Sequence, residues 1–111
     1  MVNYQTGKIY KLVSYQTDKC YIGSTCNPLY KRFFQHKHNC KLYKESKYSY
    51  VSSFELIDYD DCEIVLIENY PCNDKNELHK RERYHIENTE HCVNKVIPTR
   101  TNKEYKKNTM K

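Results

Sequence analysis

The sequence lacks the features by which membrane and secreted proteins are usually recognised. It contains no run of about 18 apolar residues, the length that a membrane-spanning helix requires. Its first residues, MVNYQTGK, contain no apolar stretch of the kind that a signal peptide needs. We therefore expect an intracellular protein, in the cytoplasm or the nucleus, with no membrane partner.

Closely paired cysteines are also missing. The chain has 6 cysteines, but no two of them form a CxxC pair, so a closed zinc site has little support. The nearest approach to a metal-binding cluster is formed by His36, His38 and Cys40. We interpret the cysteines instead as reduced thiols that pack like small apolar side chains.

The length and the tyrosine content favour one folded domain. A chain of 111 residues has room for a single core. The mean hydropathy is low, at -1.00, but 12 of the residues are tyrosines, which bury well when the hydroxyl group finds a partner. The composition therefore argues against a chain that is disordered throughout.

Charge is unevenly distributed along the chain. Residues 1–51 hold 9 Lys and Arg against 2 Asp and Glu, residues 52–92 hold 4 against 11, and residues 93–111 hold 6 against 1. Clustered cations bind polyanions by displacing counterions from phosphates. The two basic ends therefore favour a nucleic acid partner, although ordinary solvated charge would explain the same bias.

The apolar pattern predicts an α+β fold. Residues 8–14 and 19–24 read as two strands of a hairpin, although the connection lacks the Asn-Gly or Asp-Gly of a tight turn. Residues 62–70 contain a continuous apolar run, which predicts a strand covered on both faces. The expected sheet is thus small, three-stranded and antiparallel, with an N-terminal hairpin and one later strand.

Helices are predicted between and after these strands. Asn27 as N-cap and Pro28 as first helical residue predict a helix to about residue 39, followed by an exposed loop over residues 41–50. Residues 52–57 could form a short helix. Asp74-x-x-Glu77 resembles a capping box at the start of a helix over residues 75–88.

Charged residues interrupt the apolar stripes of both long helices. Arg32 and His36 lie on the stripe of the first helix, and Glu82 lies between apolar neighbours in the second. A buried lone charge is costly, so each needs a partner or an ion. The pattern leaves two interpretations open: a salt bridge between Arg32 and Glu82, or a functional pocket.

Two tyrosines could contribute to the same pocket. If the hairpin closes around residues 15 and 16, Tyr10 and Tyr21 lie opposite each other. Gly23 would leave open backbone beside them, often a sign that a ligand approaches closely. Simple packing of two tyrosines in a sheet is the alternative.

The ordered set of these residues resembles the GIY-YIG nuclease family. It consists of KIY and YIG, with ten residues between their tyrosines, then Arg32 and His36, then Glu82, then Asn94. The resemblance covers residues 7–95, which we expect to be the catalytic domain, with residues 96–111 as a basic C-terminal tail or the start of a linker. It implies a three-stranded antiparallel sheet flanked by helices.

The resemblance also implies a function and roles for particular residues. The function is that of a metal-dependent DNA endonuclease that hydrolyses phosphodiester bonds. The implied catalytic residues are Tyr10, Tyr21, Arg32 and His36, with Gly23 and Asn94 in supporting roles. Glu82 would hold one divalent cation, Mg²⁺ or Mn²⁺.

Chemical reasoning assigns these residues distinct tasks. Arg32 suits the scissile phosphate because its planar fork matches phosphate geometry. Tyr10 is the favoured general base, with its pKa lowered by Arg32 and the metal. Tyr21 would orient water or phosphate, and His36 is the alternative base.

One position departs from the family pattern, because Lys8 replaces the glycine of the first motif. Its ammonium group could contact phosphate or crowd the site, so a non-catalytic DNA-binding module that keeps the nuclease fold is the alternative function. A protein-interaction domain is a third possibility. The DNA target and the oligomeric state stay open.

Further cations and aromatic side chains are candidates for contacts with DNA. Lys8, Lys31 and Lys37 are the first candidates for phosphate contacts, together with Lys41, Lys44 and Lys47. Tyr30 and Phe34 could stack on bases, although core packing is the favoured interpretation for Phe34.

Overall fold

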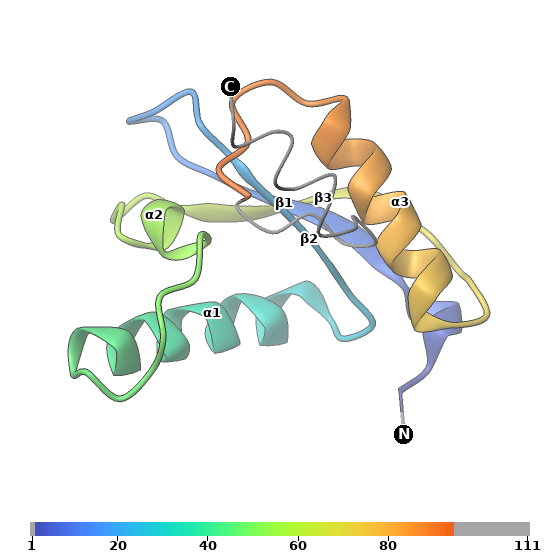
Figure 1. Ribbon diagram of the computed structural model, residues 1–111, viewed down its shortest axis with the longest axis horizontal. Helices are drawn as coiled ribbons and strands as arrows, with labels where there is room; N and C mark the ends of the chain where they lie inside the picture. Colours follow the sequence, from blue (N-terminus) through green and yellow to red (C-terminus); the bar gives the residue numbers. More distant parts are fainter. Residues whose placement is uncertain (1, 95–111) are drawn as a thin grey trace, which may run out of the picture.

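The computed structural model describes residues 2–94, and the predicted tail of residues 96–111 lies outside this range. The elements in order are η1 (Tyr4–Thr6), β1 (Lys8–Val13), β2 (Tyr21–Thr25), α1 (Leu29–Lys44), α2 (Phe54–Ile57), β3 (Glu63–Asn69) and α3 (Lys75–Glu87). They form a three-stranded antiparallel sheet of order β2-β1-β3, flanked by helices (Figure 1). The predicted α+β architecture is confirmed. No helix of this described part is both long and apolar enough to cross a membrane.

The pairing of the hairpin differs from the predicted one by two residues. Tyr10 lies opposite Gly23, and Leu12 lies opposite Tyr21, so the predicted pairing of Tyr10 with Tyr21 is wrong. The connection is longer than a tight turn because Asp61 holds it: the Ser14 hydroxyl donates to Asp61 at 2.5 Å and the Tyr15 amide at 3.0 Å. Side chains alternate along a strand, so Tyr10 and Tyr21 still share one face.

The sheet has an apolar core on each face. On one face, Ile9 and Ile22 pack against Leu78 and Ile86 of α3. On the other face, Tyr10 and Leu12 pack with Leu56 of α2 and with residues of α1. Figure 1 shows α1 and α3 on the two sides of the sheet. Consecutive residues of a strand, such as Ile9 and Tyr10, therefore face different helices.

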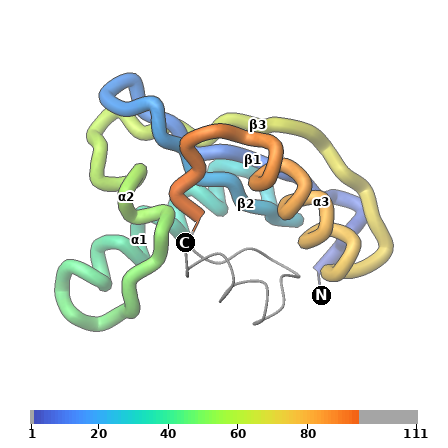
Figure 2. Tube along the Cα trace, turned by 45° about the horizontal axis from the view of Figure 1, so that its top comes forward, coloured from blue at the N-terminus to red at the C-terminus, as the bar shows by residue number. Residues whose placement is uncertain are grey.

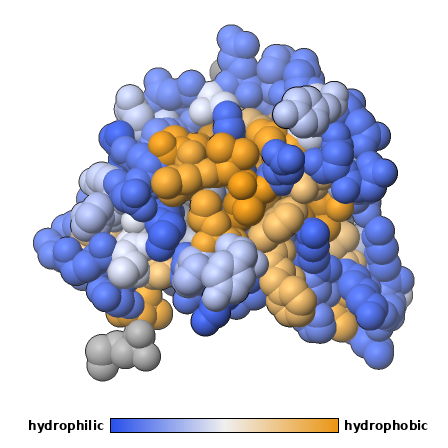
Figure 3. All heavy atoms as spheres, turned by 180° about the vertical axis from the view of Figure 1, so that it is seen from behind, coloured by the Kyte–Doolittle hydropathy of each residue, from blue (hydrophilic) through white to orange (hydrophobic). Residues whose placement is uncertain are grey.

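The strand with the strongest apolar signal is less buried than predicted. β3 is an edge strand, and Leu66 at its middle is 41% exposed. No further strand lies beyond it among residues 2–94, which leaves part of its surface uncovered. Apolar side chains gather on the surface of the molecule turned away in Figure 1, as Figure 3 shows. The prediction of a strand covered on both faces is wrong.

The first helix starts later and ends later than predicted. Its N-cap residue is Pro28, with no side-chain cap hydrogen bond, so Asn27 is not the cap. The Asn27 amide instead donates to the Thr25 hydroxyl at 3.0 Å. The helix continues to Lys44 through part of the expected loop. Lys41 and Lys44 lie in its last turn, where cations interact favourably with the helix dipole.

The helix that carries Glu82 begins as predicted. Asp74 is its N-cap and accepts from the Glu77 amide at 2.9 Å. The Glu77 carboxylate accepts from the Asn73 amide at 3.0 Å, one residue before the position of a standard capping box. The short helix α2 begins at Phe54 rather than at residue 52.

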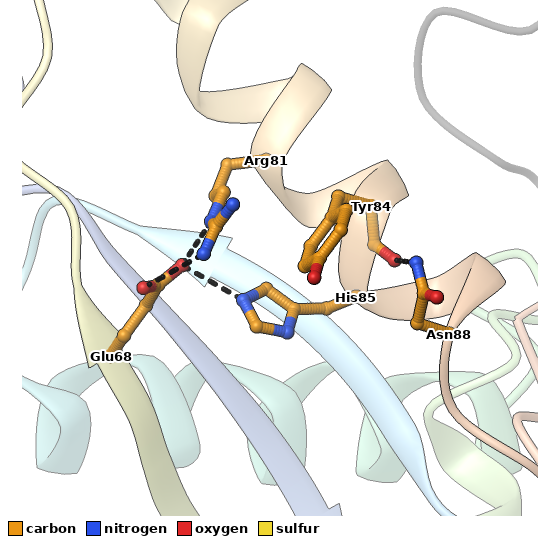
Figure 4. Close-up of polar contacts among 5 residues, drawn as sticks. All are labelled: Glu68, Arg81, Tyr84, His85 and Asn88. Carbon is orange, nitrogen blue, oxygen red and sulfur yellow. Dashed lines mark hydrogen bonds and ion pairs between the residues drawn. The ribbon is translucent and has the colours of Figure 1, made fainter.

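A cluster of charged side chains fixes α3 on the sheet. Glu68 of β3 accepts hydrogen bonds from Arg81, one of them at 3.2 Å, and from His85 at 2.8 Å (Figure 4). The guanidinium of Arg81 also lies 4.4 Å from the centre of the Tyr84 ring. Because Glu82 follows Arg81 directly, this cluster helps to set the direction in which Glu82 points.

All six cysteines are free thiols. Four of them are buried, and the sulfur atoms of Cys20 and Cys92 lie 3.8 Å apart. Burial raises the pKa of the Cys62 thiol to about 11. The predicted packing of the cysteines as small apolar groups is confirmed for the four buried ones.

Candidate active site

The centre of the candidate site is the hydroxyl group of Tyr10 on the central strand. Tyr10 is fully buried. Its oxygen accepts a hydrogen bond from Arg32 Nε at 3.2 Å and lies 2.7 Å from His36 Nε2. Arginine only donates, so the Tyr10 proton is free to point at His36. The arrangement is a short hydrogen-bonded chain from a guanidinium through a phenol to an imidazole.

α1 brings Arg32 and His36 to Tyr10 together. The two residues are four apart and therefore share one face of the helix. Arg32 also donates from Nη1 to Gln35 at 3.1 Å. Among residues 2–94, Arg32 makes no ion pair with Glu82, so the alternative of a direct salt bridge between them is not supported.

Tyr21 and Gly23 complete this face of the site. The rings of Tyr21 and His36 meet edge to face, with centroids 5.7 Å apart. Gly23 packs directly against Tyr10: a Cβ at this position would lie 2.6 Å from Tyr10 Cζ. We predicted that Gly23 leaves open backbone for a ligand, but the Tyr10 ring occupies that space. Glycine is needed here because the phenol crosses the strand closely.

Glu82 reaches the same strand from the other face of the sheet. It is 8% exposed, and its Oε1 accepts a hydrogen bond from the Ser24 hydroxyl at 2.5 Å. Among residues 2–94, no donor contacts its second oxygen, Oε2. Ser24 neighbours Gly23 in β2, so Glu82 and the Tyr10 hydroxyl approach the strand at adjacent residues.

Sequence reasoning missed Ser24 and Gln35. A signal for Ser24 was available, because it lies two residues after Ile22 and so shares the sheet face that α3 covers. Nothing in the sequence pointed to Gln35, which is an exposed polar residue in a polar helix.

Burial is the largest influence on the pKa values of Tyr10, Tyr21 and His36. It raises the pKa of Tyr10 to about 12, although the Arg32 charge and hydrogen bond act in the opposite direction. We expected Arg32 to lower this pKa, but burial outweighs it. Burial also raises the pKa of Tyr21. Burial, with a smaller contribution from the Arg32 charge, lowers the pKa of His36 to about 3, which leaves a neutral imidazole able to accept a proton.

Burial raises the pKa of Glu82 as well, against the Ser24 hydrogen bond and the Arg32 charge. The carboxylate charge is thus only partly compensated by the chain itself. Glu82 also influences the pKa of both Tyr10 and Tyr21, so these groups are electrostatically coupled although they occupy different faces of the sheet.

Asn94 stabilises the outer edge of β2. Its side chain accepts from the Ile22 amide at 3.0 Å and donates to the Ile22 carbonyl at 2.6 Å. The backbones of Cys20 and Cys92 pair in an isolated parallel β-bridge two residues before Asn94. Figure 2 shows this segment after α3 returning beside the hairpin. Asn94 thus acts on the strand that carries Tyr21 and Gly23.

The lysines lie around the site rather than within it. Lys8 donates to the Thr6 carbonyl at 2.8 Å, and Lys31 is exposed on α1. Lys37 is exposed as well, with its ammonium 4.3 Å from the centre of the Phe33 ring. Lys44 pairs with Asp58 at 2.6 Å.

Comparison with known protein families identifies the fold family. The GIY-YIG catalytic domain matches residues 7–96, most of the chain. The chain belongs to the GIY-YIG family. The comparisons with curated proteins and with solved structures gave no match. The GIY-YIG domain implies nuclease function.

The GIY-YIG sheet and helices therefore assemble the four predicted catalytic residues and Gly23 on one face and bring Glu82 to the adjacent residue of β2. A divalent cation suits the remaining oxygen of Glu82, because Oε2 has no donor among residues 2–94 and the buried charge lacks a full partner. No group of three or more His, Cys, Asp or Glu gathers in this range. A single protein carboxylate, with waters and phosphate oxygens, is a ligand set that suits Mg²⁺.

Proposed function

We propose that this chain is a divalent-metal-dependent DNA endonuclease that hydrolyses phosphodiester bonds. The observation that carries the proposal is the hydrogen-bonded chain of Arg32, Tyr10 and His36. Burying the polar groups of Tyr10 and His36 is more costly than apolar packing, because it takes them away from water. The hydrogen-bonded chain is suited to moving a proton at the Tyr10 oxygen.

Tyr10 acts as the general base in this proposal, and His36 receives its proton. The neutral imidazole accepts the phenolic proton at Nε2 as the Tyr10 oxygen takes a proton from the attacking water. The low pKa of His36 in the resting site rises when a phenolate forms beside it, because an opposite charge favours the imidazolium form. Arg32 limits the charge that develops on the Tyr10 oxygen.

Arg32 and Tyr21 meet the substrate. Arg32 is half-buried, and hydrogen bonds to Tyr10 and Gln35 use only two of its five N–H groups. The remaining N–H groups bind the scissile phosphate. Tyr21, also half-buried, orients the water or the phosphate beside His36.

Glu82 would hold one Mg²⁺ or Mn²⁺ through Oε2, while Ser24 keeps Oε1 in place. When bound, the cation supplies Lewis-acid stabilisation of charge on the phosphate and the leaving oxygen. A cation beside Glu82 also favours the ionised carboxylate, which burial alone disfavours.

The full burial of Tyr10 favours one alternative, a DNA-binding module without catalysis. A phenol that water does not reach would only support the fold. Nicking of a supercoiled plasmid in Mg²⁺ or Mn²⁺, compared with EDTA, separates the two functions. DNA binding without cleavage in either metal would favour the module.

The sharpest variant is Glu82→Gln, which keeps the size of the side chain and removes the charge. We expect cleavage to fall at least about a hundredfold while DNA binding persists. The melting temperature should stay the same or rise, because burial disfavours the Glu82 charge. Glu87→Gln on the exposed surface of the same helix is the control and should cleave normally. Unchanged nicking by Glu82→Gln would remove the assignment of the metal ligand.

A further inference from the structure

A basic and aromatic surface lies on α1, on the side turned away from the core. We define this α1 platform by its five residues, Tyr30, Lys31, Phe34, His38 and Lys41. Spacings of three and four residues place them on one face of the helix. All five are exposed, and both Tyr30 and Phe34 are 70% exposed. The predicted packing of Phe34 in the core is therefore wrong.

The aromatic rings of the platform are arranged for stacking. The rings of Phe34 and His38 are nearly parallel, with an interplanar angle of 5° and centroids 6.3 Å apart. Tyr30 lies one turn before Phe34 on the same face. Single exposed apolar residues are common on proteins, but aligned aromatic side chains on consecutive turns offer a continuous surface to planar groups.

The charge of α1 indicates what that planar partner is. The helix contains five Lys and Arg residues and no Asp or Glu. A second copy of this surface would bring like charges together, and an apolar partner would leave the lysines unpaired. Nucleic acid supplies both complements, phosphates for the cations and bases for the rings.

We infer that the α1 platform binds unpaired bases of the DNA substrate next to the scissile phosphate, an inference that rests on the proposed function. In a duplex the faces of the bases are already stacked on one another, so only an unpaired base can stack on Phe34 or Tyr30. The substrate class is therefore DNA with a single-stranded segment beside the cut.

Exposed polar side chains, Lys31 and Gln35, lie around α1 between the aromatic rings of the platform and the proposed reaction site. Arg32 donates to Gln35 at 3.1 Å, and Gln35 is exposed between Arg32 and Lys31 on the helix surface. Arg32 and Phe34 are two residues apart and so lie on nearly opposite sides of α1, but the width of a helix is only roughly 10 Å. A few extended nucleotides therefore reach from the phosphate at Arg32 to the aromatic rings.

Binding of fluorescent DNA by the full chain in EDTA tests this inference. The probes are a single-stranded oligonucleotide and a blunt duplex that contains the same sequence, compared by fluorescence anisotropy. We expect tighter binding of the single strand. Phe34→Ala and Tyr30→Ala should each weaken that binding roughly tenfold, with a much smaller effect on the duplex. If a 2-aminopurine base in the single strand stacks on the platform, its fluorescence is quenched in the wild type and should be less quenched in both variants.

Two further variants make the result specific. Phe34→Leu keeps an apolar side chain and should weaken single-strand binding nearly as much as Phe34→Ala, because stacking needs the ring. Tyr15→Ala removes a tyrosine that is 92% exposed in the hairpin turn and should change neither probe. Equal melting temperatures for all four variants confirm that the fold is intact.

Several outcomes would overturn the inference. Equal affinity of wild type for both probes would do so, as would Phe34 variants that bind the single strand normally. A dimer that Phe34→Ala dissociates in light scattering would show that the platform contacts a second copy instead. Plasmid nicking by the wild type tests the proposed function separately. Nicking without a preference for single strands would contradict only the proposed role of the α1 platform. Preferential binding of single strands without nicking would contradict only the proposed endonuclease activity.

Discussion

At the scale of single residues, the buried Tyr10 hydroxyl group can accept one hydrogen bond and donate another. Tyr10 accepts from Arg32 and faces a neutral imidazole nitrogen of His36. The Tyr21 hydroxyl has no hydrogen-bond partner among residues 2–94, although its ring packs against His36. The two tyrosines of the family motif thus have different surroundings, and their removal should have different consequences.

Replacing each tyrosine by phenylalanine separates these roles. Tyr10→Phe leaves His36 Nε2 and Arg32 Nε without their shared partner and should lower the free energy of unfolding by about 1–3 kcal/mol. It should also reduce cleavage by about a hundredfold or more. Tyr21→Phe should reduce cleavage while the stability changes little. Urea unfolding and plasmid nicking measure both effects, and equal stability losses in the two variants would contradict the assignment.

The low pKa of His36 predicts a particular dependence of stability on pH. The folded chain keeps His36 neutral down to pH about 3, whereas the ordinary value is 6.5. Between these values the unfolded chain binds a proton that the folded chain excludes, so stability falls as pH falls. The loss at pH 5 is roughly 2 kcal/mol relative to neutral pH.

The variant His36→Gln isolates this contribution. Glu82, whose pKa is raised, acts in the opposite direction in wild type and variant alike. Tyr10, Tyr21 and Arg32, which face His36, do not change charge over this range. Urea unfolding at several pH values should therefore give a shallower acid loss for His36→Gln. Identical pH profiles would mean that folding does not lower the pKa of His36.

At the scale of elements, β2 holds the parts of the site together. Its one face carries Tyr21 and Gly23 and its other face carries Ser24, so α1 and α3 act on neighbouring residues of the same strand. β2 is an edge strand, and an edge needs support where a site depends on it. Asn94 supplies that support through two hydrogen bonds to Ile22.

Removing this support should loosen β2. Asn94→Ala leaves the amide and carbonyl of Ile22 unpaired and should cost about 1–3 kcal/mol of stability. Faster hydrogen exchange at the Ile22 amide, followed by nuclear magnetic resonance, is the specific sign. Asn88→Ala is a matched control, because the Asn88 side chain bonds only within its own helix end. Similar exchange at Ile22 in both variants would count against the role of Asn94.

At the scale of the whole molecule, charge is separated between segments. The N-terminal half and the last residues are basic, and the segment from residue 52 to residue 92 is acidic. Within the described part, α1 beside the proposed site holds cations and no acidic residue, whereas the acidic residues of the segment from 52 to 92 are spread over α2, β3, α3 and the loops between them. The surface of α1 is therefore a basic side of the molecule, the side that we propose faces DNA.

This distribution predicts binding that depends strongly on salt. Affinity for duplex DNA should fall by about one to two orders of magnitude between low and near-physiological salt. Lys31→Gln should reduce the slope of log affinity against log salt by about one. Lys75→Gln, an exposed residue of the acidic segment, should leave the slope unchanged. A slope that neither variant alters would place the phosphate contacts elsewhere.

Local pattern was sufficient to predict much of the fold. The alternation around KIY and YIG, the Asp74 cap and the stripe of Leu78, Glu82 and Ile86 all predicted elements that the structure contains. These signals depend on neighbours within a few residues, so the sequence carries them fully. Polar residues within apolar stripes also pointed to Arg32, His36 and Glu82.

The sequence by itself thus determined which elements form and which charged residues turn inward. Only the tertiary structure decided the hairpin pairing, the partner of Glu82, the exposure of Phe34 and the direction of the Tyr10 pKa. The hairpin pairing depends on Asp61, which is distant in the chain. The pKa depends on how far burial outweighs Arg32. Both are sums over contacts between remote segments, and local periodicity does not encode them.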